Sequence, residues 1–331
     1  MMNIDGLARF YLAEFPTPVH YLKNLTEAFQ GPAIYMKRDD LISLGMGGNK
    51  VRKLEFLIGE ALEQGKDTLV TAGGLQSNHC RLTAAGARKA GLDCHLVLNG
   101  KPPGSFNGNL LLDTVFGAEL HFCDRKDRDA RLYAVADDLT KAGKKPYVIP
   151  VGGSNSTGCV GYVDAMLELE KQMNEMSISP DTIVFATSSG GTQAGLVLGA
   201  GLIGFKGKIL GISIDQTKTG PEPFPPILTR IANDTAKRIG SDIRMVESDF
   251  LLDCNFLGAG YAVPGDLEFN AIRDLAKYEG ILLGPVYTAR AMGGLLEMIQ
   301  KKIFKKGETV LFWHTGGTPE LFAWASDLKR F

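Results

Sequence analysis

The chain has 331 residues, and its 36 Lys and Arg against 37 Asp and Glu give a formal net charge of −1. Proteins that bind the nucleic acid backbone carry a basic face or basic runs, so this balance argues against a nucleic acid partner. Hydrophobic residues make up 44% of the chain and charged residues 22%. These proportions are typical of a globular protein and exclude a disordered chain or a coiled coil.

Neither a targeting segment nor a membrane span is visible in the sequence. Residues 1–15 lack a long apolar run behind a basic start, so we expect no secretory signal and a cytoplasmic location. The most apolar stretch, 194–205, is too short to span a bilayer and predicts a buried helix. The five cysteines are odd in number and include no CxxC pair, which favours neither a disulfide framework nor a zinc cluster. We therefore expect no bound metal.

Seven short apolar runs alternate along the chain with segments of helical periodicity. They span 67–71, 94–98, 120–123, 147–150, 182–186, 209–214 and 309–314. This alternation predicts an α/β fold with parallel strands and helices on both faces of each sheet. Ligands in such folds bind at the carboxyl ends of the strands. Four glycine pairs stand at the predicted strand exits, where the backbone can approach a ligand, at 73–74, 152–153, 190–191 and 316–317.

The first motif in chain order, GGNKVRKLEFL at 47–57, places Lys50 directly after glycines at a predicted helix start. A cation at a helix N-terminus is electrostatically unfavourable. If it is buried there, its pKa falls and it becomes an amine suited to Schiff-base chemistry. A plain exposed lysine is the alternative, and this motif alone does not decide between the two.

The second motif, at 72–81, is a strand followed by glycines and a polar cluster that caps a helix. Its backbone donors could hold a substrate carboxylate, Asn78 could donate to a cofactor oxygen, and Ser77 could carry a proton. Helix capping alone is an equally good explanation of Ser77 and Asn78. His79 and Cys80 are adjacent and point to different sides of a helix, so we expect no Cys–His nucleophilic pair.

The third motif, at 187–195, leaves an apolar strand and opens a helix with three hydroxyl residues and two glycines. The backbone N–H groups of such a turn, together with the helix dipole, suit a phosphate dianion. A serine-rich helix cap is the alternative. The turn lacks the lysine of a nucleotide-binding P-loop, so the phosphate would belong to a small cofactor.

Taken together with GPVYT at 284–288 and HTGG at 314–317, these motifs resemble one family of enzymes. The chain is similar to the pyridoxal-phosphate enzymes of the D-cysteine desulfhydrase and 1-aminocyclopropane-1-carboxylate deaminase group. The resemblance runs from PTP at 16–18 and KRDD at 37–40 to residue 322. It rests on five motifs in the same order.

The resemblance implies the tryptophan-synthase β-like fold, PLP fold type II, with two open, twisted, mostly parallel sheets flanked by helices. A large cofactor-binding domain would comprise residues 1–48 and 160–331, and a small inserted α/β domain would comprise residues 49–159. It further implies pyridoxal 5'-phosphate as cofactor, a small amino acid as substrate and a homodimer as assembly.

Carried over by motif, Lys50 would form the Schiff base, Asn78 would bond the cofactor's phenolic oxygen, and Tyr287 would lie against its pyridine ring. The cofactor's phosphate would be held by Ser188, Ser189, Gly190, Gly191 and Thr192, and Thr315 would also contact the cofactor. The substrate would be bound by Ser77, Asn78, His79, Tyr261 and Thr288. The catalytic residues would be Lys50, Ser77 and Tyr287, with Lys50 or Ser77 removing the Cα proton.

Two positions bear on the reaction. The deaminase branch has PVYE and HLGG, whereas this chain has Thr288 after Tyr287 and Thr315 before the glycines. A neutral hydroxyl near the pyridine nitrogen makes a weaker electron sink than a carboxylate would, which suffices when a carbanion can expel sulfide. The resemblance therefore implies α,β-elimination, with D-cysteine converted to pyruvate, hydrogen sulfide and ammonia.

Some positions depart from the branch and leave the substrate open. Gly284 and Arg290 replace a common aspartate and lysine around PVY, and Leu82 replaces a common glutamine. L-Cysteate sulfo-lyases share HTGG, a small hydroxyl residue after PVY and the pattern at 153–162. L-Cysteate is therefore the first alternative substrate, and 1-aminocyclopropane-1-carboxylate is the second.

Overall fold

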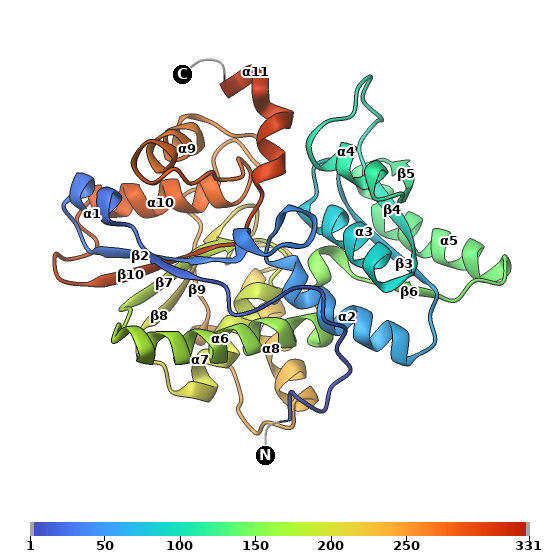
Figure 1. Cartoon of the computed structure of the whole chain (residues 1–331), viewed down its shortest axis with the longest axis horizontal. Helices are drawn as coiled ribbons and strands as arrows, with labels where there is room; N and C mark the ends of the chain where they lie inside the picture. Colours follow the sequence, from blue (N-terminus) through green and yellow to red (C-terminus); the bar gives the residue numbers. More distant parts are fainter. Residues whose placement is uncertain (1–2, 329–331) are drawn as a thin grey trace.

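Two open β-sheets, one of six strands and one of four, lie side by side in the computed structural model, each flanked by helices (Figure 1). The structure describes residues 3–328. Within this range, no helix is both long enough and apolar enough to cross a membrane.

The six-stranded sheet has the order β1-β2-β10-β7-β8-β9 and draws on both ends of the chain. Only β1 pairs antiparallel, and the other neighbours are parallel. Thr309 pairs with Ala33 and His314 with Arg38, so the last strand lies directly beside the second. The strands are β1 (Val19–Tyr21), β2 (Ala33–Arg38), β7 (Thr182–Thr187), β8 (Lys208–Ser213), β9 (Leu251–Asp253) and β10 (Thr309–His314).

The four-stranded sheet is fully parallel, with the order β5-β4-β3-β6. It comes from one continuous stretch of the chain and contains β3 (Thr68–Gly74), β4 (Asp93–Asn99), β5 (Glu119–Cys123) and β6 (Pro146–Val148). The predicted division into residues 1–48 with 160–331 and residues 49–159 stays a prediction.

Helices cover both faces of each sheet, as the alternation of elements predicts. The longer ones are α1 (Lys23–Phe29), α2 (Lys50–Glu63), α3 (Asn78–Ala90), α4 (Gly108–Val115), α5 (Arg128–Lys141), α6 (Ser156–Met176), α7 (Gly191–Ile203), α8 (Phe224–Arg238), α9 (Asp266–Glu279) and α10 (Thr288–Gln300), followed by the short α11 (Ala325–Leu328). Short 3-10 helices are η1 (Asp39–Leu41), η2 (Leu44–Met46), η3 (Arg125–Asp127), η4 (Val151–Gly153), η5 (Glu247–Asp249) and η6 (Thr318–Trp324).

Alternating side chains of β10 fill the cores on the two faces of the large sheet. Leu311 and Trp313 pack with α6, α7 and α8, whereas Val310 and Phe312 pack with α1, α9 and α10. This is the period-two alternation of a strand that is buried on both faces. The small sheet is covered by α2, α3 and α4 on one face and by α5 on the other.

Each of the seven predicted runs overlaps a strand, and the apolar stretch 194–205 lies mostly in α7 and is largely buried. The prediction missed β1, β2 and β9. Both β1 and β9 have three residues, while β2 ends in Lys37 and Arg38. Those two charged side chains are buried because they pair with Glu168 and Asp40, which an apolar pattern cannot anticipate.

A buried ionic network fixes the start of α2, which packs against both α6 and α3. Arg52 donates to the carboxylate of Asp39 at 2.9–3.1 Å and to Glu168. Asp39 also accepts from the Tyr162 hydroxyl at 2.6 Å and the Trp313 indole at 2.8 Å. Burial alone would raise the pKa of Asp39, but Arg52 and its other partners hold it below its usual value. Helix α2 is therefore anchored two residues beyond Lys50.

Candidate functional site

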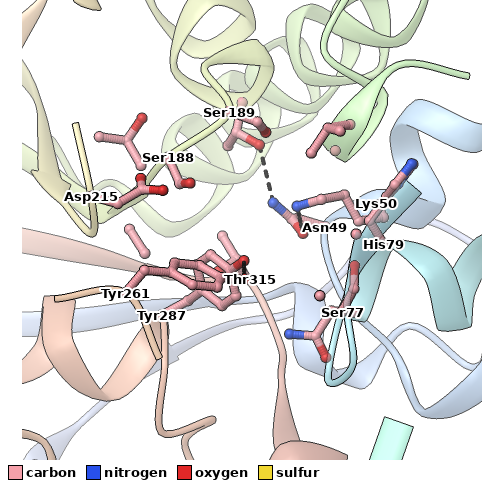
Figure 2. Close-up of a pocket in the computed structure, with 18 of the residues that line it drawn as sticks. Asn49, Lys50, Ser77, His79, Ser188, Ser189, Asp215, Tyr261, Tyr287 and Thr315 are labelled. Atoms are coloured by element: carbon pink, nitrogen blue, oxygen red, sulfur yellow. Dashed lines mark hydrogen bonds between the residues drawn. The ribbon is translucent and has the colours of Figure 1, made fainter. Parts of the chain in front are cut away.

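A pocket opens at the carboxyl ends of the parallel strands, between the two sheets, as the topology rule predicts (Figure 2). The predicted site residues that line it are Lys50, Ser77, Asn78, His79, Ser188, Ser189, Gly190, Thr192, Tyr261, Tyr287 and Thr315. Gly191 and Thr288 are outside this lining. The motifs that lie far apart in the sequence therefore meet in one cavity.

Lys50 is the first residue of α2 and is half-buried in the pocket. Its Nζ donates to the Asn49 side-chain oxygen at 2.9 Å. Burial lowers the pKa of Lys50 to about 8, with the charge of Arg81 adding to the shift and Glu320 opposing it. A substantial fraction of this amine is therefore neutral and nucleophilic at mildly alkaline pH.

The turn between β7 and α7 forms a cradle for an anion. Gly190 adopts a left-handed conformation, with φ of +91°, and α7 begins at Gly191. Ser154 reaches this turn from the other side, because its hydroxyl accepts from the Gly191 N–H at 3.1 Å and donates to Ser189 at 2.9 Å. Backbone N–H groups and hydroxyls thus converge at a helix N-terminus.

Lys53 adds an amine to this cradle, and the sequence analysis did not single it out. Its buried Nζ donates to the Gly152 carbonyl at 3.1 Å, and a Cβ built at Gly191 would lie 2.9 Å from it. Burial, and then the charge of Lys50, lower its pKa well below the usual value. Its i+3 spacing from Lys50, which places both on one helix face, was the available signal.

The Ser77–His79 segment caps α3. The Ser77 hydroxyl accepts from the Cys80 N–H at 3.2 Å, as a helix cap does. His79 pairs with the Thr71 hydroxyl at 2.9 Å, and burial, with Lys50 and Lys53, lowers its pKa well below the usual value. His79 is therefore neutral. Ser77 therefore both caps α3 and lines the pocket, and one role does not exclude the other.

Tyr261 and Tyr287 form the opposite wall of the pocket, with their hydroxyls 2.7 Å apart (Figure 2). Burial raises the pKa of Tyr261 to about 12 and raises that of Tyr287 well above its usual value. Both hydroxyls therefore keep their protons at neutral pH and can donate hydrogen bonds. The guanidinium of Arg125 lies over the Tyr261 ring, 5.8 Å from its centroid.

The two threonines predicted at the site have different positions. Thr315 lines the pocket, and its carbonyl accepts from the Asn49 N–H at 3.0 Å. Thr288 is fully buried, and its hydroxyl accepts from the Gly284 N–H at 2.8 Å and donates to the Gly316 carbonyl at 3.1 Å. In this structure Thr288 therefore ties the GPVYT and HTGG segments together beside the pocket.

Two departures from the resembled branch have a structural reason. A Cβ at Gly284 would lie 2.6 Å from the Gly317 carbonyl oxygen, so this backbone leaves no room for an aspartate. Arg290 pairs with Glu268 and donates to the carbonyls of Leu257 and Gly260 at 2.8 and 3.1 Å. It thereby holds the loop that carries Tyr261.

Other residues that line the pocket also escaped the sequence analysis. Asp215 follows β8, Arg125 lies in η3, and Arg128 begins α5. Glu320, in η6, is fully buried behind the pocket and bonds to the amide of Asn78. They belong to segments with no recognisable motif, and only the folded chain brings them to the pocket.

A Schiff-base cofactor with a phosphate group requires an amine with a lowered pKa, and a phosphate cradle of N–H groups, hydroxyls and a second amine. The sequence pattern of the family described as pyridoxal-phosphate dependent enzyme matches residues 10–316. The chain belongs to this family. Pyridoxal phosphate is its cofactor, and the residues present fit that group: the Lys50 amine, and a buried Lys53 for which no carboxylate partner is found among residues 3–328.

Relatives of this pyridoxal-phosphate enzyme extend over its full length. A D-cysteine desulfhydrase of Salmonella typhimurium is 41% identical over 334 residues, covering 98% of this chain and 99% of that protein. A D-cysteine desulfhydrase of Salmonella newport is 40% identical with the same coverage. The family, and with it the D-cysteine desulfhydrase and ACC deaminase group, is therefore confirmed as predicted.

Solved structures agree on the fold. A structure described as an ACC deaminase homologue matches with a TM-score of 0.89 at 36% identity, covering 99% of this chain and 97% of that one. The processed form of threonine deaminase isoform 2 from Solanum lycopersicum matches with a TM-score of 0.67 at 14% identity, covering 96% of this chain and 83% of that one. This second likeness concerns the fold alone. The predicted α/β class of two mostly parallel sheets is confirmed.

Proposed function

We propose that this enzyme catalyses α,β-elimination on a small cysteine-like amino acid, and that D-cysteine is converted to pyruvate, hydrogen sulfide and ammonia. The observation that carries the proposal is the Lys50 amine, with its pKa near 8, between the phosphate cradle and the tyrosine pair. The 41% identity to a D-cysteine desulfhydrase over nearly the whole chain supports the choice of substrate.

The cofactor, when bound, supplies an electron sink for the negative charge that develops at Cα. Lys50 would hold it covalently, and the turn from Ser188 to Thr192 would hold its phosphate together with Lys53. Asn78 would face its phenolic oxygen, and Tyr287 its ring. All of these residues except Lys53 and Gly191 line the pocket, which supports the assignments.

The chain's own groups would then move the protons. Ser77 and the backbone of the 74–79 turn would hold the substrate carboxylate, and Lys50 or Ser77 would accept the Cα proton. The Cβ–S bond would break, and the sulfur would leave as hydrosulfide, stabilised by a hydrogen bond from the Tyr261–Tyr287 pair, whose hydroxyls are both protonated. The released enamine would take up water to give pyruvate and ammonia.

L-Cysteate is the second candidate substrate, and one observation favours it. Arg125 and Arg128 line the pocket. A sulfonate is a permanent anion that a guanidinium binds well, whereas a thiol needs no cation. Opening of 1-aminocyclopropane-1-carboxylate ranks third, because Thr288 brings no carboxylate to the site. The two-domain division and a homodimer are carried forward as further proposals.

The test is a product assay on cofactor-loaded protein with D-cysteine, L-cysteine, L-cysteate and 1-aminocyclopropane-1-carboxylate in parallel. Sulfide and pyruvate in equal amounts from D-cysteine alone would support the desulfhydrase. Sulfite and pyruvate from L-cysteate would favour the sulfo-lyase instead. Ammonia with 2-oxobutanoate from the cyclopropane, and nothing from the other three, would contradict both eliminations.

A further inference from the structure

Glu320 is a buried carboxylate behind the pocket. One of its oxygens accepts from the side-chain nitrogen of Asn78, and the other accepts from the Val286 N–H at 3.4 Å. Asn78 begins α3 against the small sheet, whereas Glu320 lies in η6, which follows the last strand of the large sheet. The contact therefore joins the two halves of the site.

The side-chain oxygen of the Asn78 amide also has hydrogen-bond partners. Its oxygen accepts from the Asn109 side chain at 2.9 Å and from Arg81 at 3.2 Å. An asparagine amide has two N–H donors and one acceptor oxygen. Flipping it would set its oxygen against Glu320 and its N–H groups against the donors of Asn109 and Arg81. The amide is therefore fixed in one orientation, with one N–H left for the pocket that Asn78 lines.

We propose that Glu320 is a positioning residue, which holds the Asn78 amide so that its second N–H faces the phenolic oxygen of the bound cofactor. The proposal rests on the proposed function for the role of Asn78. Gly317 leaves space for the contact, because its φ is +104° and a Cβ there would lie 3.3 Å from the Asn78 nitrogen. Burial raises the pKa of Glu320 to about 8, and either protonation state keeps an acceptor oxygen. The contact therefore does not require the charge.

The test compares Glu320→Ala with Glu320→Gln in the holoenzyme. In Glu320→Ala, we expect the cofactor's dissociation constant to rise about tenfold or more. The reason is that the hydrogen bond from Asn78 to the cofactor's charged phenolic oxygen is weakened. The apparent pKa of the bound cofactor's absorbance titration should rise too, since a donor to the phenolic oxygen stabilises its deprotonated form. Glu320→Gln keeps an acceptor, so both quantities should stay near those of the unchanged protein.

Glu55→Ala is the matched control for lost stability. Glu55 is a fully buried carboxylate that accepts from the Leu12 N–H at 2.9 Å and lies outside the pocket lining. This variant should lower the melting temperature without moving the cofactor titration. An unmoved titration and dissociation constant in folded Glu320→Ala, or an equal loss in Glu320→Gln, would overturn the positioning role.

A crystal structure of cofactor-free Glu320→Ala gives a readout that needs no turnover. Asn78 should have left its contacts with Asn109 and Arg81, and their retention would also count against the proposal. Failure of the proposed function would look different, since the unchanged protein would then show no covalently bound cofactor or no elimination.

A separate cluster lies on the small sheet, on the face that α5 covers. His95 is directly opposite Glu119 in the pairing of β4 with β5, and His121 follows two residues later on the same face. Nδ1 of His95 lies 3.1 Å from Nε2 of His121 and 3.3 Å from the carboxylate of Glu119. The ligand atoms of all three lie within 4.8 Å of one another.

We infer that these three side chains bind a divalent transition metal such as Zn²⁺. Two imidazoles and a carboxylate form a common zinc ligand set, and bonds of about 2.0–2.1 Å in a tetrahedron place ligand atoms roughly 3.3 Å apart. The ion would replace the proton that the two rings share, and Glu119, with its side chain 72% exposed, leaves an entry path.

The charge of Arg131 beside His121 opposes the ion, so the affinity has to be measured. Metal-free holoenzyme is titrated with Zn²⁺ against a chromophoric chelator, and with Co²⁺ followed by its visible absorbance. We expect one ion per chain. His121→Ala and Glu119→Gln should each weaken metal binding by about tenfold or more, because replacing even a residue that only contacts a ligand lowers metal affinity by that much. The control is His20→Ala, which changes an exposed histidine outside the cluster. This variant should bind the metal ion as the unchanged protein does. Unaltered binding in His121→Ala would overturn the site.

Discussion

The hydroxyls of Tyr261 and Tyr287 lie 2.7 Å apart although the two residues come from different segments. Tyr287 precedes α10, and Arg290 in the first turn of that helix bonds to the carbonyls of the 257–263 loop, which carries Tyr261. One helix start thus positions both phenols. Because each hydroxyl keeps its proton, the pair can assist departure of the leaving group.

Replacing Tyr261 by Phe should therefore impair turnover while leaving the cofactor in place. We expect kcat/KM for the elimination substrate to fall about tenfold or more, since a hydrogen-bond donor to the departing sulfur is lost. The absorbance of the bound cofactor should be unchanged, because Lys50 and the phosphate cradle are untouched. Steady-state kinetics beside an absorbance spectrum check this, and unchanged kcat/KM would remove Tyr261 from the proposed mechanism.

Lys50→Ala should abolish covalent attachment and turnover together, because Lys50 is the only lysine among residues 3–328 that lines the pocket. The neighbouring Lys53 is committed to Gly152 and Ser154. Borohydride reduction followed by mass spectrometry measures attachment, and a product assay measures turnover. The assignment fails if the variant is still labelled or keeps full activity.

Lys53→Met should weaken binding of pyridoxal phosphate but not of pyridoxal. The buried amine of Lys53 lies beside the 188–192 turn and, among the residues that the structure describes, has no anionic partner until a phosphate binds. Removing this amine should therefore raise the dissociation constant of pyridoxal phosphate about 10- to 100-fold. Pyridoxal has no phosphate and provides the internal control. Equal losses for both compounds would mean that Lys53 supports the fold and not the phosphate.

Asp39→Asn should destabilise the protein and reduce its sensitivity to acid. Breaking a buried pair costs about 3–5 kcal/mol in free energy of unfolding, and the isosteric change should fall near the lower end. Because Arg52 holds the pKa of Asp39 below its usual value, this stabilisation is present above the unfolded pKa of about 4 and is lost as pH falls through the folded pKa.

Melting curves over a range of acidic pH measure the effect of Asp39. The unchanged protein should lose more stability on acidification than Asp39→Asn does. Asp93→Asn is the matched control, because Asp93 pairs with Lys144 at a half-exposed position where an ion pair contributes at most about 1 kcal/mol. Parallel pH profiles for the unchanged protein and Asp39→Asn would contradict this account.

Local signals in the sequence predicted seven strand regions, from β3 to β8 and β10, and the pocket's main motifs. Lys50 and Ser77 follow glycines at a helix start or strand exit, and the 188–192 turn contains a glycine pair. Each of these patterns is complete within about ten residues. Parallel topology then brings such exits to one edge of the sheets. Most of the motifs that line the pocket could therefore be predicted before the fold was known.

The partners of those motifs were decided only by tertiary structure. Glu320 meets Asn78 across 242 residues of chain, and no local pattern marks either partner for the other. The same holds for Arg125 above Tyr261, and for β2, whose buried Lys37 and Arg38 become tolerable through ion pairs formed after folding.

The sequence by itself predicted most of the elements, the family and Lys50 as a residue of the pocket, because periodicity and turn chemistry act between near neighbours. Folding decided which buried charges and amides surround that lysine, and so set its pKa near 8. The physical reason is that desolvation and hydrogen bonding depend on distances through space, which separation along the chain does not specify.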